Sequence, residues 1–174
     1  DDDDDSQSTG AKMKIIDSEG TVGICTSIAA DNNGVYLSYY DGSNADLKFA
    51  RSTDNGATWL NENMKIVDSD NGVGTESSIA VDGANIYISY RDLSNGNLKF
   101  AKSVNSGSTW LASNIKVVDA TDDVGTGTSL AVIGSNIYIA YLDQTNYNLK
   151  FTKSTDSGAT WPAAAIKTVD SAGN

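Results

Sequence analysis

Short runs of β-branched and aromatic residues alternate with clusters of Gly, Asn, Asp and Ser along most of the chain. The clearest runs are Val35–Tyr40, Ile86–Arg91 and Ile137–Leu142. Each run is bounded by turn-forming residues, a pattern typical of β-strands. No segment shows the 3.6-residue apolar spacing of an amphipathic helix. The pattern therefore predicts an all-β protein.

The strand pattern recurs in three units of equal length. Each unit opens on a short apolar run, at Ile28, Ile79 or Leu130, and continues with one of the aromatic runs. The third and fourth runs of the units are, in order, Leu47–Ala50 and Met64–Val67, Leu98–Ala101 and Ile115–Val118, and Leu149–Thr152 and Ile166–Val169. Four-stranded units of about 40–50 residues are typical of β-propeller blades. We therefore predict three four-stranded antiparallel blades, at about 24–68, 75–119 and 126–170, within a domain covering 12–174.

A fourth copy of the last strand precedes the first blade. Lys14–Asp17 resembles the ends of the three fourth runs, so we expect a spare N-terminal strand. Three blades are too few to close a ring, since about four to eight are usual, and an open array would expose two apolar faces. We expect an incomplete ring that needs either more chain or oligomerisation. Two copies would give six blades, whereas a non-closing contact would give a filament.

An eight-residue signature, Ser-x-Asp-x-Gly-x-Thr-Trp, lies between the third and fourth predicted strands of every unit. We call these three segments, at 52–59, 103–110 and 154–161, the signature turns. Their tryptophans are 51 residues apart, and only the second copy departs, with Asn in place of Asp. The specified positions are Ser52, Asp54, Gly56, Thr58 and Trp59; Ser103, Asn105, Gly107, Thr109 and Trp110; and Ser154, Asp156, Gly158, Thr160 and Trp161.

The signature resembles the Asp box, or bacterial neuraminidase repeat, of sialidase-like β-propellers. The resemblance covers roughly residues 12 to 170. It implies that each box is the hairpin turn joining the third and fourth strands of a blade. In such a turn the Asx side chain accepts backbone N–H groups and Gly supplies a positive φ. The resemblance thus implies a structural role for the boxes and assigns them no catalysis.

The chain lacks most of the groups that a sialidase would need. The resemblance implies three arginines that clamp a carboxylate, a Tyr nucleophile with a Glu partner, and an Arg-Ile-Pro motif. The sequence has two arginines, Arg51 and Arg91, a single proline, Pro162, three scattered glutamates and no histidine. We therefore expect no catalysis, but a binding role for glycan or extracellular protein ligands. Two alternatives stay open: a self-assembling structural subunit of an extracellular oligomer or filament, and a fragment of a sialidase-like glycoside hydrolase.

Acidic and aromatic residues after the predicted strands are the candidate ligand-binding groups. Asp41, Asp92 and Asp143 recur after the second strand, and a second set recurs after the fourth, at Asp68, Asp119 and Asp170. We expect both sets on the face opposite the signature turns, where they either cap turns or bind sugar hydroxyls or calcium. Residues outside the repeat complete the candidates: Tyr40, Arg91 and Tyr147, with Glu76, Asp122 and Asp123 as weaker ones. No cofactor is expected, with calcium left open.

Composition narrows the range of partners and compartments. The net charge is −11 and the pI about 4.2, which argues against nucleic acid as a partner. No run reaches the roughly 20 apolar residues of a membrane span. The aspartate-rich segment 1–11 is expected to be a disordered tail. It resembles the tether of a bacterial lipoprotein or secreted protein, so a secreted or cell-surface location is one interpretation and a plain solvated tail the other. Cys25, the only cysteine, is expected to be buried.

Overall fold

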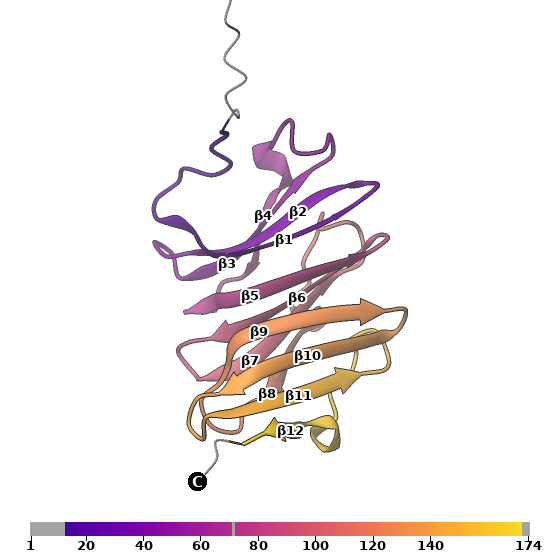
Figure 1. Cartoon of the computed structure of the whole chain (residues 1–174). Helices are drawn as coiled ribbons and strands as arrows, with labels where there is room; N and C mark the ends of the chain where they lie inside the picture. The colour runs from indigo at the N-terminus through magenta and orange to yellow at the C-terminus, as the bar shows by residue number, and fades with distance from the viewer. Residues whose placement is uncertain (1–12, 71, 172–174) are drawn as a thin grey trace, which may run out of the picture.

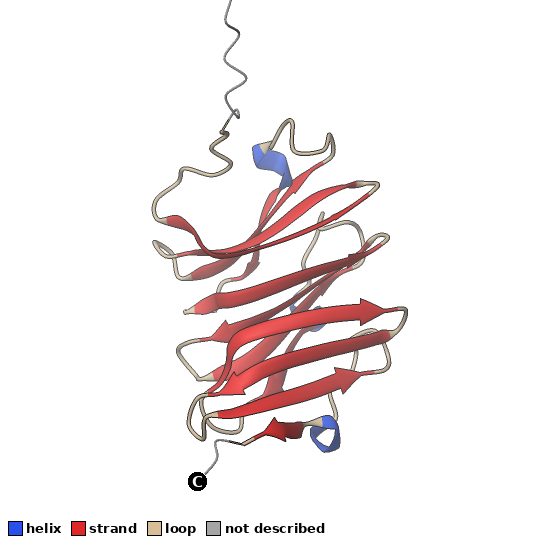
Figure 2. Ribbon diagram, in the orientation of Figure 1, coloured by secondary structure: helices blue, strands red, loops and turns tan. Residues whose placement is uncertain are grey.

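The structure, a computed structural model, describes residues 13–70 and 72–171 as three four-stranded antiparallel sheets (Figures 1 and 2). Each sheet is one predicted blade, with its strands in sequence order. The strands of blade 1 are β1 (Val22–Asp31), β2 (Gly34–Asp41), β3 (Asp46–Ser52) and β4 (Met64–Asp68). Those of blade 2 are β5 (Val73–Asp82), β6 (Asn85–Asp92), β7 (Asn97–Ser103) and β8 (Ile115–Asp119). Those of blade 3 are β9 (Val124–Ile133), β10 (Asn136–Asp143), β11 (Asn148–Ser154) and β12 (Lys167–Asp170).

The blades follow one another as a row, with blade 2 between blades 1 and 3 (Figure 1). β1 contacts β5, and β5 contacts β9, so the first strands form the inner side of the row. Three short 3₁₀ turns, η1 (Asn61–Asn63), η2 (Ala112–Asn114) and η3 (Ala163–Ala165), are the helical elements of the described chain (Figure 2). None is long and apolar enough to cross a membrane within that part of the chain.

The apolar core lies between blades, because the bulky groups of each sheet point to both of its faces. Tyr36, Leu47 and Phe49 of blade 1 pack against Ile79 and Ile88 of blade 2. The residues 51 positions further on, including Tyr87, Leu98 and Phe100, pack against blade 3 in the same way. This two-sided burial explains why the second strands, such as β6, are apolar on both faces.

The signature turns have the hydrogen bonds expected from their sequence. In the first, the Asp54 carboxylate accepts the backbone N–H of Thr58 at 2.7 Å and its hydroxyl at 2.6 Å. Ser52 Oγ donates to Asp54 at 2.7 Å and accepts the Gly56 N–H at 2.9 Å. Gly56 has a φ of 84°, so the glycine supplies the left-handed conformation that the turn requires.

The N-terminal segment differs from the expectation of a spare strand. Residues 14–17 form no strand, because in the three described sheets β2 and β3 already pair with their neighbours. β1 begins at Val22, two residues before the predicted start of blade 1, and β5 and β9 begin two residues early as well. The predicted acidic tail, 1–11, lies outside the described residues.

Each first strand begins with a β-bulge that the sequence did not reveal. The pairing register of β1 with β2 shifts between Val22 and Ser27, and Cys25 adopts a φ of 52°. Glu76 and Gly127, the equivalent residues of β5 and β9, have φ values of 54° and 59°. The expectation that Cys25 is buried is wrong: its side chain is half-buried, because the bulge takes it out of the alternation between the two faces of the strand.

Candidate functional site

One end of the blades carries the turns between second and third strands together with the connections between blades. We call this end the loop face. The two kinds of loop are joined by backbone hydrogen bonds: Gly42 N–H to Thr21 at 2.7 Å, Leu93 N–H to Gly72 at 2.8 Å, and Gln144 N–H to Asp123 at 2.7 Å. The signature turns lie at the other end of the antiparallel strands, as expected from the sequence.

Three candidate carboxylates on the loop face form hydrogen bonds within their own turns. Asp41 accepts the backbone N–H of Asn44 at 3.2 Å and its side-chain amide at 2.9 Å. Asp92 and Asp143 make the same bonds with the asparagines three residues later. Burial alone would raise the pKa of Asp41, but the hydrogen bonds from Asn44 outweigh it and lower the pKa. The geometry thus matches the turn-capping interpretation of all three.

The second set of aspartates joins each blade to the next. Tyr90 donates its hydroxyl to Asp68 at 2.6 Å, and Lys99 Nζ lies 2.6 Å from the same carboxylate. We call this arrangement, an Asp with a Tyr and a Lys of the following blade, a junction cluster. The second cluster contains Asp119, Tyr141 and Lys150, with distances of 2.7 and 2.6 Å.

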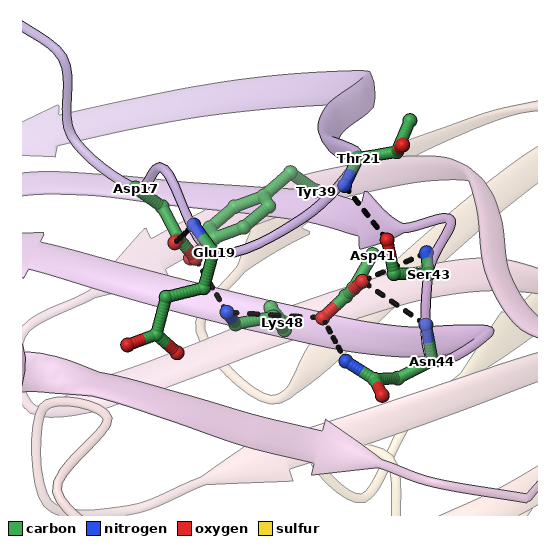
Figure 3. A network of polar contacts seen from close by, with 8 residues as sticks. All are labelled: Asp17, Glu19, Thr21, Tyr39, Asp41, Ser43, Asn44 and Lys48. Carbon is green, nitrogen blue, oxygen red and sulfur yellow. Dashed lines mark hydrogen bonds and ion pairs between the residues drawn. The ribbon is translucent and has the colours of Figure 1, made fainter.

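A further junction cluster forms on the segment that precedes blade 1. Asp17 accepts the hydroxyl of Tyr39 at 2.9 Å and pairs with Lys48 (Figure 3). Figure 3 shows Lys48 between Asp17 and the turn-capping Asp41, whose carboxylate is 3.9 Å from Lys48 Nζ. Asp17 therefore occupies the position of Asp68 and Asp119, although its segment is not a strand.

The junction clusters hold opposite charges away from solvent. Burial would raise the pKa of Asp119, but hydrogen bonds from Lys150 and Tyr141 outweigh it and hold that pKa below its usual value. Burial and the adjacent Asp119 raise the pKa of Tyr141 well above its usual value. These shifts keep Asp119 ionised and Tyr141 protonated at neutral pH, which suits a structural role.

Residues outside the repeat gather on the loop face where blades 2 and 3 meet. Arg91 Nη2 donates to Asp123 of the blade 2–3 connection at 2.5 Å. The bulged Glu76 accepts the backbone N–H of Gly127 in β9 at 3.3 Å. Tyr147, in the turn after β10, is 70% exposed. Its equivalents in blades 1 and 2 accept backbone N–H groups from the connection to the following blade, so Tyr147 lies on the side of the blade 3 turn away from blade 2. We call Glu76, Arg91 and Asp123, together with Tyr147 on the outer side of the blade 3 turn, the blade 2–3 patch.

The remaining candidates are not part of this patch. Asp122 lies beside it and accepts the side-chain amide of Asn146 at 3.1 Å. Tyr40 lies in β2 of blade 1, opposite Ile24, and is half-buried. Among residues 13–70 and 72–171, no three His, Cys, Asp or Glu side chains are placed to hold a metal ion together.

Sequence reasoning missed one buried carboxyl group, that of Asp46. It begins β3 opposite Asp41 and is 8% exposed. Burial raises its pKa, and the nearby carboxylates of Asp41 and Asp68 raise it further. The available signal was a departure from the repeat, because blades 2 and 3 have Asn97 and Asn148 at this position.

No protein-family model and no curated protein matches the sequence. Solved structures do resemble the fold. The catalytic domain of a GH62 alpha-L-arabinofuranosidase from Coprinopsis cinerea has 11% identity and a TM-score of 0.54, with 86% of this chain and 51% of that chain covered. A family 117 glycoside hydrolase from the marine bacterium Zobellia galactanivorans has 17% identity and a TM-score of 0.54, covering 80% and 54%.

An arabinanase from Bacillus subtilis has 12% identity and a TM-score of 0.53, with 86% of this chain and 57% of that chain covered. The chain thus spans about half the length of these structures. At such low identities the likeness shows the fold alone: an all-β array of propeller blades.

Proposed function

We propose that the chain is a non-catalytic, extracellular binding module whose loop face holds a glycan. The observation that carries the proposal is that repeated and non-repeated polar residues have different surroundings. Those that repeat every 51 residues are used within turns and blade junctions. Several that depart from the repeat lie in the blade 2–3 patch, where the exposed Tyr147 ring is on the same loop face as the charged pair of Arg91 and Asp123.

The chemistry of the patch suits a sugar. A tyrosine ring offers an apolar face with a polar tip, and carboxylate and guanidinium groups form the strongest hydrogen bonds to polar ligands. The fold is shared with structures whose names are those of glycoside hydrolases, and the signature turns resemble the Asp box. These likenesses support glycan as the ligand class and a secreted or cell-surface location.

A second candidate, a glycoside hydrolase fragment, is favoured by one observation. Asp46 is buried and its pKa is raised, as a general acid requires. Glycoside hydrolysis also needs a second carboxylate across the bound sugar. The nearest carboxylate, that of Asp41, is bound to its own turn, so we rank binding first.

Binding can be tested on a glycan array with the Tyr147→Ala variant and a matched control. Leu93 is also exposed in a loop-face turn, in blade 2, so Leu93→Ala removes a similar surface outside the patch. We expect wild type and the control to bind the same glycans, and Tyr147→Ala to bind about tenfold more weakly, since loss of an aromatic contact of about 1.4 kcal/mol has that effect. Absence of glycan binding, or full binding by Tyr147→Ala, would contradict the proposal.

A further inference from the structure

The two blade junctions inside the chain use one set of contacts twice. On the earlier blade, a tyrosine and a phenylalanine ring stack, with centroids 6.4 Å apart for Tyr36–Phe49 and 6.2 Å for Tyr87–Phe100. On the later blade, a signature-turn tryptophan meets the phenylalanine, at 5.3 Å for Trp110 and 5.1 Å for Trp161.

The signature-turn glycine of the later blade lies directly beneath the phenylalanine. A Cβ built on Gly107 would be 2.2 Å from Phe49, and one on Gly158 would be 2.4 Å from Phe100. The contact therefore needs glycine in that turn, in addition to the tryptophan. It is specific to the pairing of an earlier blade with a later one.

Blade 3 presents the earlier half of this junction, and within the part of the chain that the structure describes no further blade packs on it. Tyr138 and Phe151 stack at 6.2 Å, as in the other blades. Leu149 is 43% exposed, whereas its equivalents Leu47 and Leu98 are fully buried. We call this surface the trailing face; its apolar residues are Tyr138, Leu149, Phe151 and Val169.

Blade 1 presents the later half, also uncovered. Ile28 is 66% exposed, whereas its equivalent Ile79 is 6% exposed. A Cβ on Gly56 would meet no atom within 4 Å, unlike those on Gly107 and Gly158. We call this surface the leading face; its residues are Val22, Ile28, Leu37, Gly56 and Trp59.

We propose that the trailing face of one copy docks on the leading face of a second copy, in the geometry of the internal junctions. The occupant of each face is thus another molecule of this chain. Phe151 of one copy would lie on Gly56 and against Trp59 of the other. This interface continues the internal one, because both of its halves are present on a single chain and, among the described residues, no other blade covers either of them.

Polar contacts are matched across the same junction. Ser27 accepts the N–H of Ile79 at 3.2 Å, and Ser78 accepts that of Leu130 at 3.1 Å. Ser129 is the next member of this series, and between copies it would accept the N–H of Ile28. One contact is lost: Ala140 stands where Ser38 and Ser89 each bond a hydroxyl of the following blade.

At its outer edge each junction has room for a single strand of the β4 or β8 type, but the two docked copies would bring two. Asp17 already bonds Tyr39 and Lys48, so docking brings β12 of the other copy, with Asp170, to an occupied position. β12 is four residues long and exposed throughout. Lys14–Asp17 has Ile where β12 has Thr168 and Val169, closer to the internal strands β4 and β8. In the assembly, Lys14–Asp17 of one copy therefore pairs with β11 of the other copy and displaces that copy's β12.

Sedimentation analysis of paired variants tests the junction. We expect wild type to show a mass at least twice that of one chain. Ile28→Asp and Leu149→Asp should each be monomeric, because each places a charge in one face. An equimolar mixture of the two should restore a dimer, since each contributes one intact face. Val117→Asp, at an exposed site on the outer strand of blade 2, is the matched control and should assemble like wild type.

The mixture also separates loss of a face from loss of folding, because a misfolded variant could not restore assembly. A monomeric wild type would overturn the proposal and point to further blades or another protein as the cover. Assembly that survives both face variants would overturn it as well. At the outer edge, Ile16→Asp should abolish assembly and Val169→Asp should not; the reverse result would contradict the exchange of strands.

Discussion

Single Asx side chains close the signature turns. Asp156 accepts the N–H of Thr160 at 3.0 Å and its hydroxyl at 2.6 Å. Asn105 achieves the same closure, since its carbonyl accepts the N–H of Thr109 at 3.0 Å and its amide donates to the Thr109 hydroxyl at 2.9 Å. The second copy thus retains the function of the turn after a change of charge.

This equivalence predicts the outcome of two substitutions at one site. Asp156→Asn should leave the thermal midpoint of unfolding close to that of wild type, because the amide can repeat the bonds of Asn105. Asp156→Ala should lower the midpoint, because the Thr160 N–H loses its acceptor. Differential scanning calorimetry of both variants measures this, and equal midpoints for the two would contradict it.

The carboxylates of the signature turns should also respond to acid. Hydrogen bonds from Thr58, then Ser52, lower the pKa of Asp54 to about 2, and those from Ser154 and Thr160 lower the pKa of Asp156 to about 2. A lowered pKa stabilises the fold above the unfolded value near 4, and that contribution disappears as the pH falls towards 2. Carboxyl carbon NMR titration should give midpoints near 2, and midpoints near 4 would refute the assigned bonds.

At the scale of elements, the fourth strand of each blade is anchored by the next blade. Asp119 ends β8 and is held by Tyr141 of β10 and Lys150 of β11. Asp170 ends β12 at the equivalent position and is exposed. We therefore expect the aspartate that ends the fourth strand to contribute more to the free energy of unfolding in β8 than in β12.

Alanine substitution should reveal that difference. Asp119→Ala removes the carboxylate that lies 2.6 Å from the buried ammonium group of Lys150 and leaves Asp143, 4.0 Å away, as its remaining carboxylate, so it should cost about 3–5 kcal/mol. Asp170→Ala should cost within about 0.5 kcal/mol, as is usual at exposed sites. Urea unfolding of both variants gives the two free energies. Equal losses would show that the junction cluster does not anchor the strand.

The signature glycines offer a second comparison between blades. Gly107 and Gly56 both have positive φ, but only Gly107 has a phenylalanine of another blade above it. Gly107→Ala should destabilise the fold by about 1–3 kcal/mol more than Gly56→Ala, because the added methyl group overpacks the junction. The comparison is best made by urea unfolding in the Leu149→Asp background, where assembly contributes nothing. A difference near zero would contradict the close contact.

The repeat made the elements predictable, and the departures from it were harder to interpret. Strand order and blade number follow from runs such as Val35–Tyr40, which recur at a fixed period. The pairing of Asp68 with Tyr90 and Lys99 was not predictable, since it depends on how one blade meets the next. The raised pKa of Asp46 likewise reflects burial and neighbouring charges that no local pattern specifies. Lys14–Asp17 has the sequence of a strand, but it pairs with none of the strands in the described sheets.

At the scale of the whole molecule, the polar residues of the three blades fall into two groups: those that stabilise turns and junctions, and those that lie on the surface of the loop face. Most of the repeated polar groups form hydrogen bonds within turns and junctions, whereas the residues of the blade 2–3 patch differ from blade to blade. The two end faces carry matching halves of one junction. A ligand-binding loop face on an array that pairs through its ends would allow several sites to act together.

Proton NMR of an oligosaccharide mixed with the protein tests the binding role most directly. A panel of neutral and acidic oligosaccharides is a suitable first set of ligands. A non-catalytic glycan-binding module should broaden the signals of a bound sugar while its anomeric signals stay constant over hours. New reducing-end anomeric signals would contradict the account by showing hydrolysis, and unbroadened spectra for every glycan tested would contradict it by showing no binding.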